Sequence, residues 1–253
     1  MRLSPLSWLV ALLAFATSVF AGDPQRVLFI GNSYTGVNKL PDIFLEVVKA
    51  SGRPVPVVKS STPGGRTLKQ HLGIPGSMNL IDQGGWDVVV LQGHSQEPAI
   101  AEKDEAVRRE FLESAAELCR RVRAKSPQAR IFFYETWARH ADYWTATKKG
   151  PEVGADPREM QERLRKWYGV AAKENDATPV PCGDAWALNY ASAKPLRLHT
   201  KDNSHPEFAG TYLNALVFFG KIYDVKAPAP VWVGKLDQGQ AMLLQGYAAQ
   251  VLK

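Results

Sequence analysis

The sequence has few cysteines and no recognisable metal-binding spacing. Its 253 residues include only two cysteines, Cys119 and Cys182. There is no Cys-x-x-Cys pair and no His-Glu-x-x-His motif, the spacings that hold zinc, so no metal site is expected. An oxidising compartment would permit the two cysteines to pair, but the sequence does not say whether they meet.

The sequence also lacks the charge pattern of a nucleic-acid-binding protein. Its 31 basic and 25 acidic residues give a net charge of +6, and the basic residues are scattered along the chain. The one tight basic cluster, residues 120–123, lies in a predicted helix, where a solvated face is the ordinary interpretation. No basic stripe is interleaved with aromatic residues, so no nucleic-acid partner is expected.

Long hydrophobic runs are absent after the N-terminus. Residues 1–21 begin with Arg2, continue through an apolar stretch at 8–16, and end on small residues at Val19 and Ala21. This pattern predicts a cleaved signal peptide and a secreted or periplasmic protein. An uncleaved or lipid anchor is the alternative, although the apolar part is shorter than the ~20 residues of a membrane span. No stable membrane span is expected after cleavage.

The rest of the chain, 22–253, alternates strand-like and helix-like segments without repeats or long linkers. Strands are predicted at residues 27–30, 55–59, 86–91, 130–134 and 178–181. Helices are predicted at residues 44–51, 104–125, 157–175, 207–224 and 235–252. This alternation favours one α/β domain, a parallel sheet of about five strands covered by helices on both sides.

Small and polar residues follow several of these strands. The segments are Gly31-Asn32-Ser33, residues 63–67, residues 92–95 and, ahead of a C-terminal helix, residues 202–206. Parallel strands present their carboxyl ends at one edge of the sheet, so segments that are distant in sequence can meet there.

These segments supply the parts of a serine nucleophile. A serine hydroxyl needs a base to take its proton and a third group to orient that base. Asp202 and His205 are three residues apart, so Asp202 could hold one imidazole nitrogen while the other faces Ser33. The N–H groups of Ser33 and Gly65 and the side chain of Gln92 could stabilise an oxyanion. Each motif taken alone is more often a turn or a helix cap.

Taken together, Gly31-Asn32-Ser33, Gly65 and Asp202-x-x-His205-Pro206 resemble the SGNH (GDSL-type) hydrolases over nearly the whole mature chain. The resemblance implies a three-layer α/β/α, flavodoxin-like fold and ester hydrolysis without a metal or other cofactor. By the family pattern Ser33 is the nucleophile, His205 the base, Asp202 its partner and Gly65 the oxyanion glycine.

Two motifs depart from the family pattern. The first reads GNSY rather than GDSL, a common variant. The third reads Gln92-Gly93-His94, where the family often has Gly-x-Asn-Asp with its Asn in the oxyanion hole. It resembles the Gln-Gly subset that includes sialate and xylan acetylesterase-like members. Gln92 is the predicted side-chain donor, with His94 as the alternative.

The sequence therefore predicts an exported serine esterase that hydrolyses short-chain esters, with O-acetyl groups on carbohydrate as the preferred substrate. His94, Trp137 and Trp144 are candidate substrate-binding residues, and ordinary aromatic packing is the other interpretation of the two tryptophans. The alternatives are a lipase or thioesterase of the same family and a non-catalytic carbohydrate-binding protein. The sugar, the acyl length and the oligomeric state are not determined by the sequence.

Overall fold

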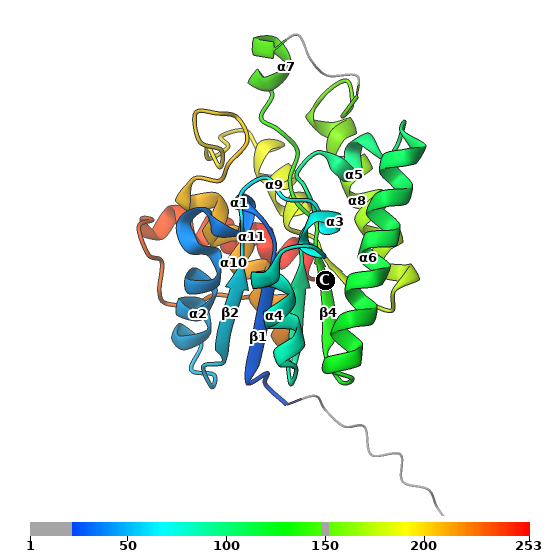
Figure 1. The fold of residues 1–253 in the computed structure, drawn as a ribbon. Coiled ribbons are helices and arrows are strands. Elements are labelled where there is room, and N and C mark those ends of the chain that lie inside the picture. Colours follow the sequence, from blue (N-terminus) through cyan, green and yellow to red (C-terminus); the bar gives the residue numbers. More distant parts are fainter. Residues whose placement is uncertain (1–21, 148–151) are drawn as a thin grey trace, which may run out of the picture.

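The computed structural model describes residues 22–147 and 152–253; the expected signal peptide, 1–21, lies outside these ranges. Its centre is a five-stranded parallel sheet in the order β2-β1-β3-β4-β5 (Figure 1). This is the flavodoxin-like strand order, in which ligands bind at the carboxyl ends of the strands. The strands are β1 (Arg26–Ile30), β2 (Val57–Ser61), β3 (Val88–Leu91), β4 (Arg130–Tyr134) and β5 (Thr178–Val180).

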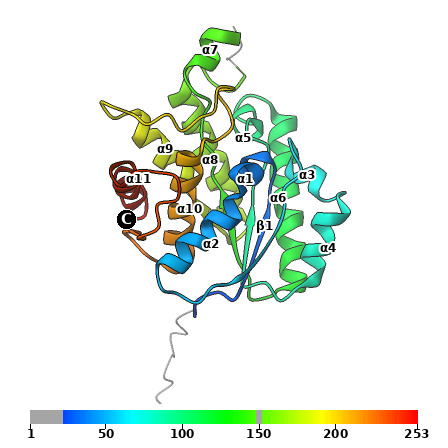
Figure 2. The same ribbon diagram turned by 90° about the vertical axis from the view of Figure 1, so that its left-hand side faces the viewer.

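Helices cover both faces of the sheet and give the three layers visible in Figure 2. One face carries α2 (Leu40–Ala50), α9 (Cys182–Tyr190), α10 (Phe208–Tyr223) and α11 (Gln238–Val251). The other carries α4 (Pro75–Gln83), α6 (Glu105–Lys125) and α8 (Pro157–Glu174). The shorter elements are α1 (Ser33–Gly36), η1 (Val37–Lys39), α3 (Leu68–His71), α5 (Glu97–Ile100) and α7 (Asp142–Thr147). The predicted α/β/α fold is confirmed.

The central strands are apolar because both of their faces are buried. All four residues of β3 are buried, and alternate side chains of β1 enter the two separate core clusters. Cys119 belongs to the core on the α6 side and Cys182 to the core on the α10 side. Both thiols are free and buried, so the sheet separates them and no disulfide joins them.

The sequence misplaced one strand and left several helices unpredicted. β2 begins at Val57, two residues after the predicted start. Pro54 and Pro56 lack the N–H group needed for the ladder, and the first paired donor is the Val57 N–H, which bonds the Gln25 carbonyl. Within the described ranges, no helix combines the length and apolar character required to cross a bilayer.

Candidate active site

The turn that carries the candidate nucleophile, Gly31-Asn32-Ser33, forms where β1 ends. Asn32 caps the short helix α1, its side-chain oxygen accepting the Tyr34 N–H at 3.0 Å. Gly31 is required by space: an added Cβ would lie 2.5 Å from Thr35 Oγ1 and 2.7 Å from Gln92 Oε1. Ser33 is the first residue of α1, half-buried at the carboxyl end of the central strand.

Gln92 supports this turn from below and is inaccessible to a substrate. Its side chain is fully buried, with Oε1 accepting the Asn32 N–H at 2.9 Å and the Thr35 hydroxyl at 2.9 Å. Its Nε2 donates to the Gly93 carbonyl. The structure therefore differs from the expectation that Gln92 is an oxyanion donor. The side-chain amide instead satisfies buried backbone groups, the Asn32 N–H and the Gly93 carbonyl, which need hydrogen-bond partners inside the protein.

The Asn32 side chain joins two further loops of the site. Its Nδ2 donates to the Arg66 carbonyl at 3.0 Å and to the Gly93 carbonyl at 3.1 Å. It thereby ties the turn that carries Ser33 to the loops that follow β2 and β3. An Asn can do this where an Asp cannot, because only the amide carries N–H donors. The Asn of the GNSY motif therefore holds three loops of the site together through its side-chain amide.

The second half of the site is a tight turn before α10. His199 and Pro206 form an isolated antiparallel bridge, and the Thr200 N–H bonds the His205 carbonyl at 2.8 Å. Asn203 adopts a positive φ of 62°, which lets the chain reverse between them. The turn places Asp202 and His205 on one side.

Hydrogen bonds connect Asp202 to His205 and His205 to Ser33. Asp202 Oδ2 is 2.5 Å from His205 Nδ1, and His205 Nε2 is 2.9 Å from Ser33 Oγ. A carboxylate can only accept, so Nδ1 carries the proton and Nε2 is free to accept from the serine hydroxyl. This is the geometry that activates a serine for nucleophilic attack.

Asp202 is stabilised as a carboxylate. Partial burial raises its pKa, but the hydrogen bonds from His205, Thr200 and the backbone outweigh burial and hold the pKa well below its usual range. Its Oδ1 accepts from the Thr200 hydroxyl at 2.7 Å and from the Ser204 and His205 N–H groups at 2.8 and 2.9 Å. The group stays ionised through mildly acidic pH and can balance a protonated His205.

The loops around Ser33 offer donors for an oxyanion. Among the described residues, the N–H groups of Ser33 and Gly65 have no protein acceptor. Gly65 is exposed and has φ +68°, with open space around its Cβ position, so the backbone conformation rather than crowding demands glycine. The half-buried His94 follows β3. Its Nδ1 accepts the Gln96 N–H at 3.4 Å, which leaves the proton of a neutral ring on Nε2.

Burial, and secondarily the Arg139 charge, lower the pKa of His94 below its ordinary value. The ring is therefore neutral at neutral pH and presents one N–H donor. This property suits His94 to a donor role that the buried Gln92 cannot fill.

Trp137, one of the two tryptophans proposed as sugar-binding residues, is not placed as expected. Trp137 is 1% exposed and is stacked between Tyr34, at 4.3 Å, and Trp186, at 4.0 Å. Both of its faces are thus covered, and a sugar ring cannot stack on it. Trp144 lies on α7, where its Nε1 donates to the Gly154 carbonyl at 2.8 Å and anchors that helix to a loop. The packing interpretation fits both residues because each satisfies its indole N–H within the protein.

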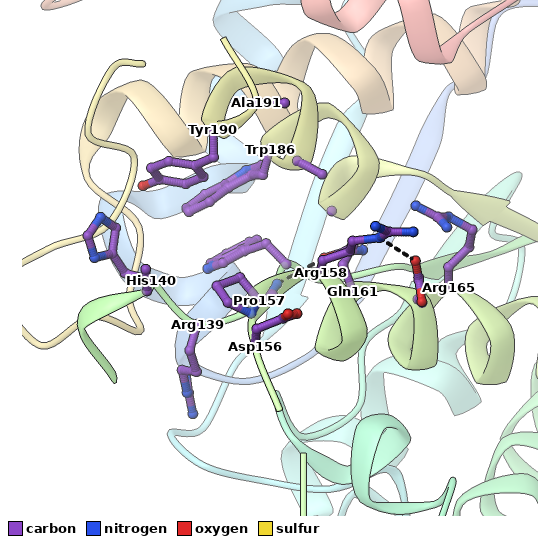
Figure 3. Close-up of a pocket in the computed structure, with 16 residues that line it drawn as sticks. Arg139, His140, Asp156, Pro157, Arg158, Gln161, Arg165, Trp186, Tyr190 and Ala191 are labelled. Carbon is purple, nitrogen blue, oxygen red and sulfur yellow. Dashed lines mark hydrogen bonds and ion pairs between the residues drawn. The ribbon is translucent and has the colours of Figure 1, made fainter. Parts of the chain in front are cut away.

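A separate cavity of about 660 Å³ opens between α8, α9 and the loop after β4 (Figure 3). Its walls include Pro157, Trp186 and Tyr190, with Arg158 and Glu162 paired at its edge. No residue of the Ser33–His205–Asp202 group lines it. Within the described residues, no group of His, Cys, Asp and Glu side chains could hold a metal ion.

Several solved structures share the fold of this chain, although its sequence matches no family model and no curated protein. A DUF4886 family protein from Bacteroides uniformis superposes with a TM-score of 0.72 at 18% identity, over 89% of this chain and 93% of that chain. A catalytic mutant of Axe2, an acetylxylan esterase from Geobacillus stearothermophilus, has a TM-score of 0.61 at 15% identity, over 79% and 95%.

A protein described as a GDSL-like lipase, from Parabacteroides merdae, has a TM-score of 0.58 at 14% identity, over 81% of this chain and 97% of that chain. The chain has the SGNH-hydrolase fold. At these identities the likeness concerns the fold. In this structure Ser33 follows β1 at the carboxyl end of the strand, and its hydroxyl oxygen is 2.9 Å from His205 Nε2.

Glu97 begins α5, next to the loop that follows β3, and should make the stability of the protein depend on pH. It is 6% exposed, and burial raises its pKa to about 7 although the His94 N–H donates to it at 3.4 Å. The unfolded chain releases this proton near pH 4.3, so the free energy of unfolding should fall as pH rises from about 4 to about 7. The loss should be on the order of 3–4 kcal/mol.

We expect Glu97→Gln to remove this dependence, because the amide keeps an acceptor for the His94 N–H and cannot ionise. Urea unfolding at pH 5 and pH 8 measures the effect, with Glu113→Gln on the exposed face of α6 as the control. Glu97→Gln should then be more stable than the wild type at pH 8. An equal loss of stability between the two pH values in Glu97→Gln and wild type would contradict the assignment.

Proposed function

We propose that this protein is an exported serine esterase that hydrolyses short-chain, O-acetyl esters of carbohydrates. The observation that carries the proposal is the unbroken chain of contacts from Asp202 through His205 to Ser33 Oγ. Esterases and lipases among the proteins of the same fold support hydrolysis of a carboxylic ester. Export rests on the predicted signal peptide alone.

The reaction proceeds in two steps. Ser33 Oγ attacks the ester carbonyl carbon while His205 Nε2 takes the serine proton, and Asp202 stabilises the imidazolium. The tetrahedral oxyanion is held by the N–H groups of Ser33 and Gly65, with His94 Nε2–H as the side-chain donor. His205 then protonates the leaving alcohol. Water, deprotonated by the same ring, releases the acyl group and restores Ser33.

Acetyl specificity and a sugar leaving group are supported by one protein of the same fold and by the position of the cavity between α8 and α9. The acetylxylan esterase of the same fold acts on an acetylated polysaccharide by its description. The apolar cavity between α8 and α9 does not include Ser33 in its lining, so it offers no direct channel for an acyl chain. A lipase or thioesterase would need such a channel, and a non-catalytic binding protein would not need the Ser33–His205 contact.

We expect acetyl esters to be hydrolysed with a higher kcat/KM than octanoyl esters. Each methylene of a longer chain contributes up to ~0.8 kcal/mol only where an apolar groove receives it. Rates along a C2 to C10 p-nitrophenyl series, measured beside acetate release from acetylated xylan, test this. A steady rise in kcat/KM toward C8 or C10 would indicate a lipase. Acetate release from polysaccharide with weak activity on all simple esters would place specificity on the alcohol side.

A further inference from the structure

One buried arginine lies behind the Ser33–His205 pair. Arg139, in the loop after β4, is 9% exposed. Its backbone borders the cavity between α8 and α9, but its side chain points away from Trp186 and Tyr190 (Figure 3). The guanidinium Nη1 donates to the hydroxyls of Tyr34 and Ser204, and Nη2 donates to the Ser95 hydroxyl at 3.0 Å.

This guanidinium has no carboxylate partner. No ion pair involves Arg139 within residues 22–147 and 152–253, and the sequence outside those ranges contains neither Asp nor Glu. Its aromatic neighbours are the Tyr34 and Tyr143 rings, 5.7 and 5.9 Å away. Burying a charge without an anion costs free energy, so stability alone does not account for an arginine here.

The three hydroxyl partners come from three different segments of the site, which are α1, the turn before α10 and the loop after β3. Tyr34 directly follows the nucleophile Ser33. Ser204 stands between Asp202 and His205, and its hydroxyl is also 2.9 Å from that of Tyr34. Ser95 belongs to the loop after β3, two residues beyond Gly93. The Tyr34 ring also packs edge-on to the His205 ring at 5.5 Å.

We propose that Arg139 is a positioning residue that sets the distance and orientation between Ser33 and His205. This inference rests on the proposed function for its kinetic consequence, but its geometric content is independent of it. The planar fork of an arginine can bond hydroxyls on separate loops at once, and lysine cannot reproduce that geometry. Without it, the hydroxyls of Tyr34 and Ser204 lose the charged donor that they share, and the two halves of the site are held together less firmly.

The kinetic test compares Arg139→Met and Arg139→Lys with Arg163→Met. Arg163 is also buried, at 6% exposure, but bonds Glu159 and the Glu152 carbonyl, away from the triad. Arg139→Met should lower kcat for p-nitrophenyl acetate on the order of 10²-fold with KM nearly unchanged, since a small displacement of reacting groups has that effect. Arg139→Lys should recover only part of the loss. Arg163→Met should leave kcat per folded molecule unchanged.

A proton NMR measurement separates this inference from the proposed function. The short His205 Nδ1–H to Asp202 bond should give a strongly downfield resonance that disappears in His205→Ala. It should shift or broaden in Arg139→Met and stay in place in Arg163→Met. If both the resonance and kcat are unchanged in folded Arg139→Met, the inference is overturned. If the resonance responds while the wild type hydrolyses no ester, the inference stands and the proposed function fails.

A double-mutant cycle with Ser204→Ala checks the route of the effect. Arg139→Met should cost much less in the Ser204→Ala background than in the wild type, because loss of the Ser204 hydroxyl already breaks the bond from the arginine to the turn that carries Asp202 and His205. Additive losses in kcat would show that Arg139 does not act through Ser204, and would overturn the proposed positioning.

Discussion

Replacing Ser33 with Ala should lower esterase turnover on the order of 10³-fold or more, and His205→Ala should have an effect of similar size. The two side chains act as one unit: without the hydroxyl there is no acyl-enzyme, and without the imidazole no group accepts the hydroxyl proton. The double variant should therefore be little worse than either single one. Initial rates with p-nitrophenyl acetate measure all three.

Asp202→Asn should cost somewhat less than the other two, because the ring keeps its place between Ser33 and the loop but loses the charge that stabilises the imidazolium. All variants must be purified free of host esterases, and Glu113→Gln serves as a purification control with wild-type rates expected. Retention of wild-type turnover by Ser33→Ala in such a preparation would contradict the mechanism.

Replacing Gln92 with Ala should damage stability and activity together. The substitution leaves the buried Asn32 N–H and Thr35 hydroxyl without their acceptor and opens a cavity below the nucleophile turn. The free energy of unfolding should fall by about 2–4 kcal/mol. The turn that carries Ser33 then loses its support, and kcat should fall on the order of 10²-fold. Urea unfolding and initial rates on the same preparation measure both effects.

His94→Ala provides the comparison that identifies the oxyanion donor. It should lower kcat on the order of 10²-fold while changing the free energy of unfolding by less than about 1 kcal/mol, as loss of one preorganised donor does. Gln92→Ala with unchanged stability and reduced kcat would restore Gln92 as a direct donor. His94→Ala with wild-type kcat would leave the oxyanion to the backbone N–H groups.

Local sequence patterns predicted the fold well where burial sets the pattern. The wholly apolar run of β3 and the helical spacing in α6 each follow from the surfaces they cover, so periodicity identifies them. β2 was harder, because this edge strand is largely exposed and preceded by prolines. The short helix α9 gives little periodic signal, since apolar residues occur on several of its sides.

The candidate site was partly predictable for a different reason. Ser33, Asp202 and His205 carry chemistry that residue type and strand-end position reveal. The supporting residues do not, because Gln92 and Trp137 serve through contacts with segments distant in sequence. The sequence indicates an amide and an indole near the site but not whether substrate or protein satisfies them. One feature of the sequence could have indicated Arg139: it is a charged residue that follows a buried strand within an aromatic segment.

The central claim is that Ser33 is an activated nucleophile, and covalent labelling tests it most directly. A fluorophosphonate probe forms a bond with a serine hydroxyl only when a neighbouring base removes its proton. Intact-mass measurement followed by peptide mapping should find one adduct per chain, located on Ser33, and none in Ser33→Ala. His205→Ala should label far more slowly. An unlabelled, correctly folded wild type, or an adduct that persists in Ser33→Ala, would contradict the account.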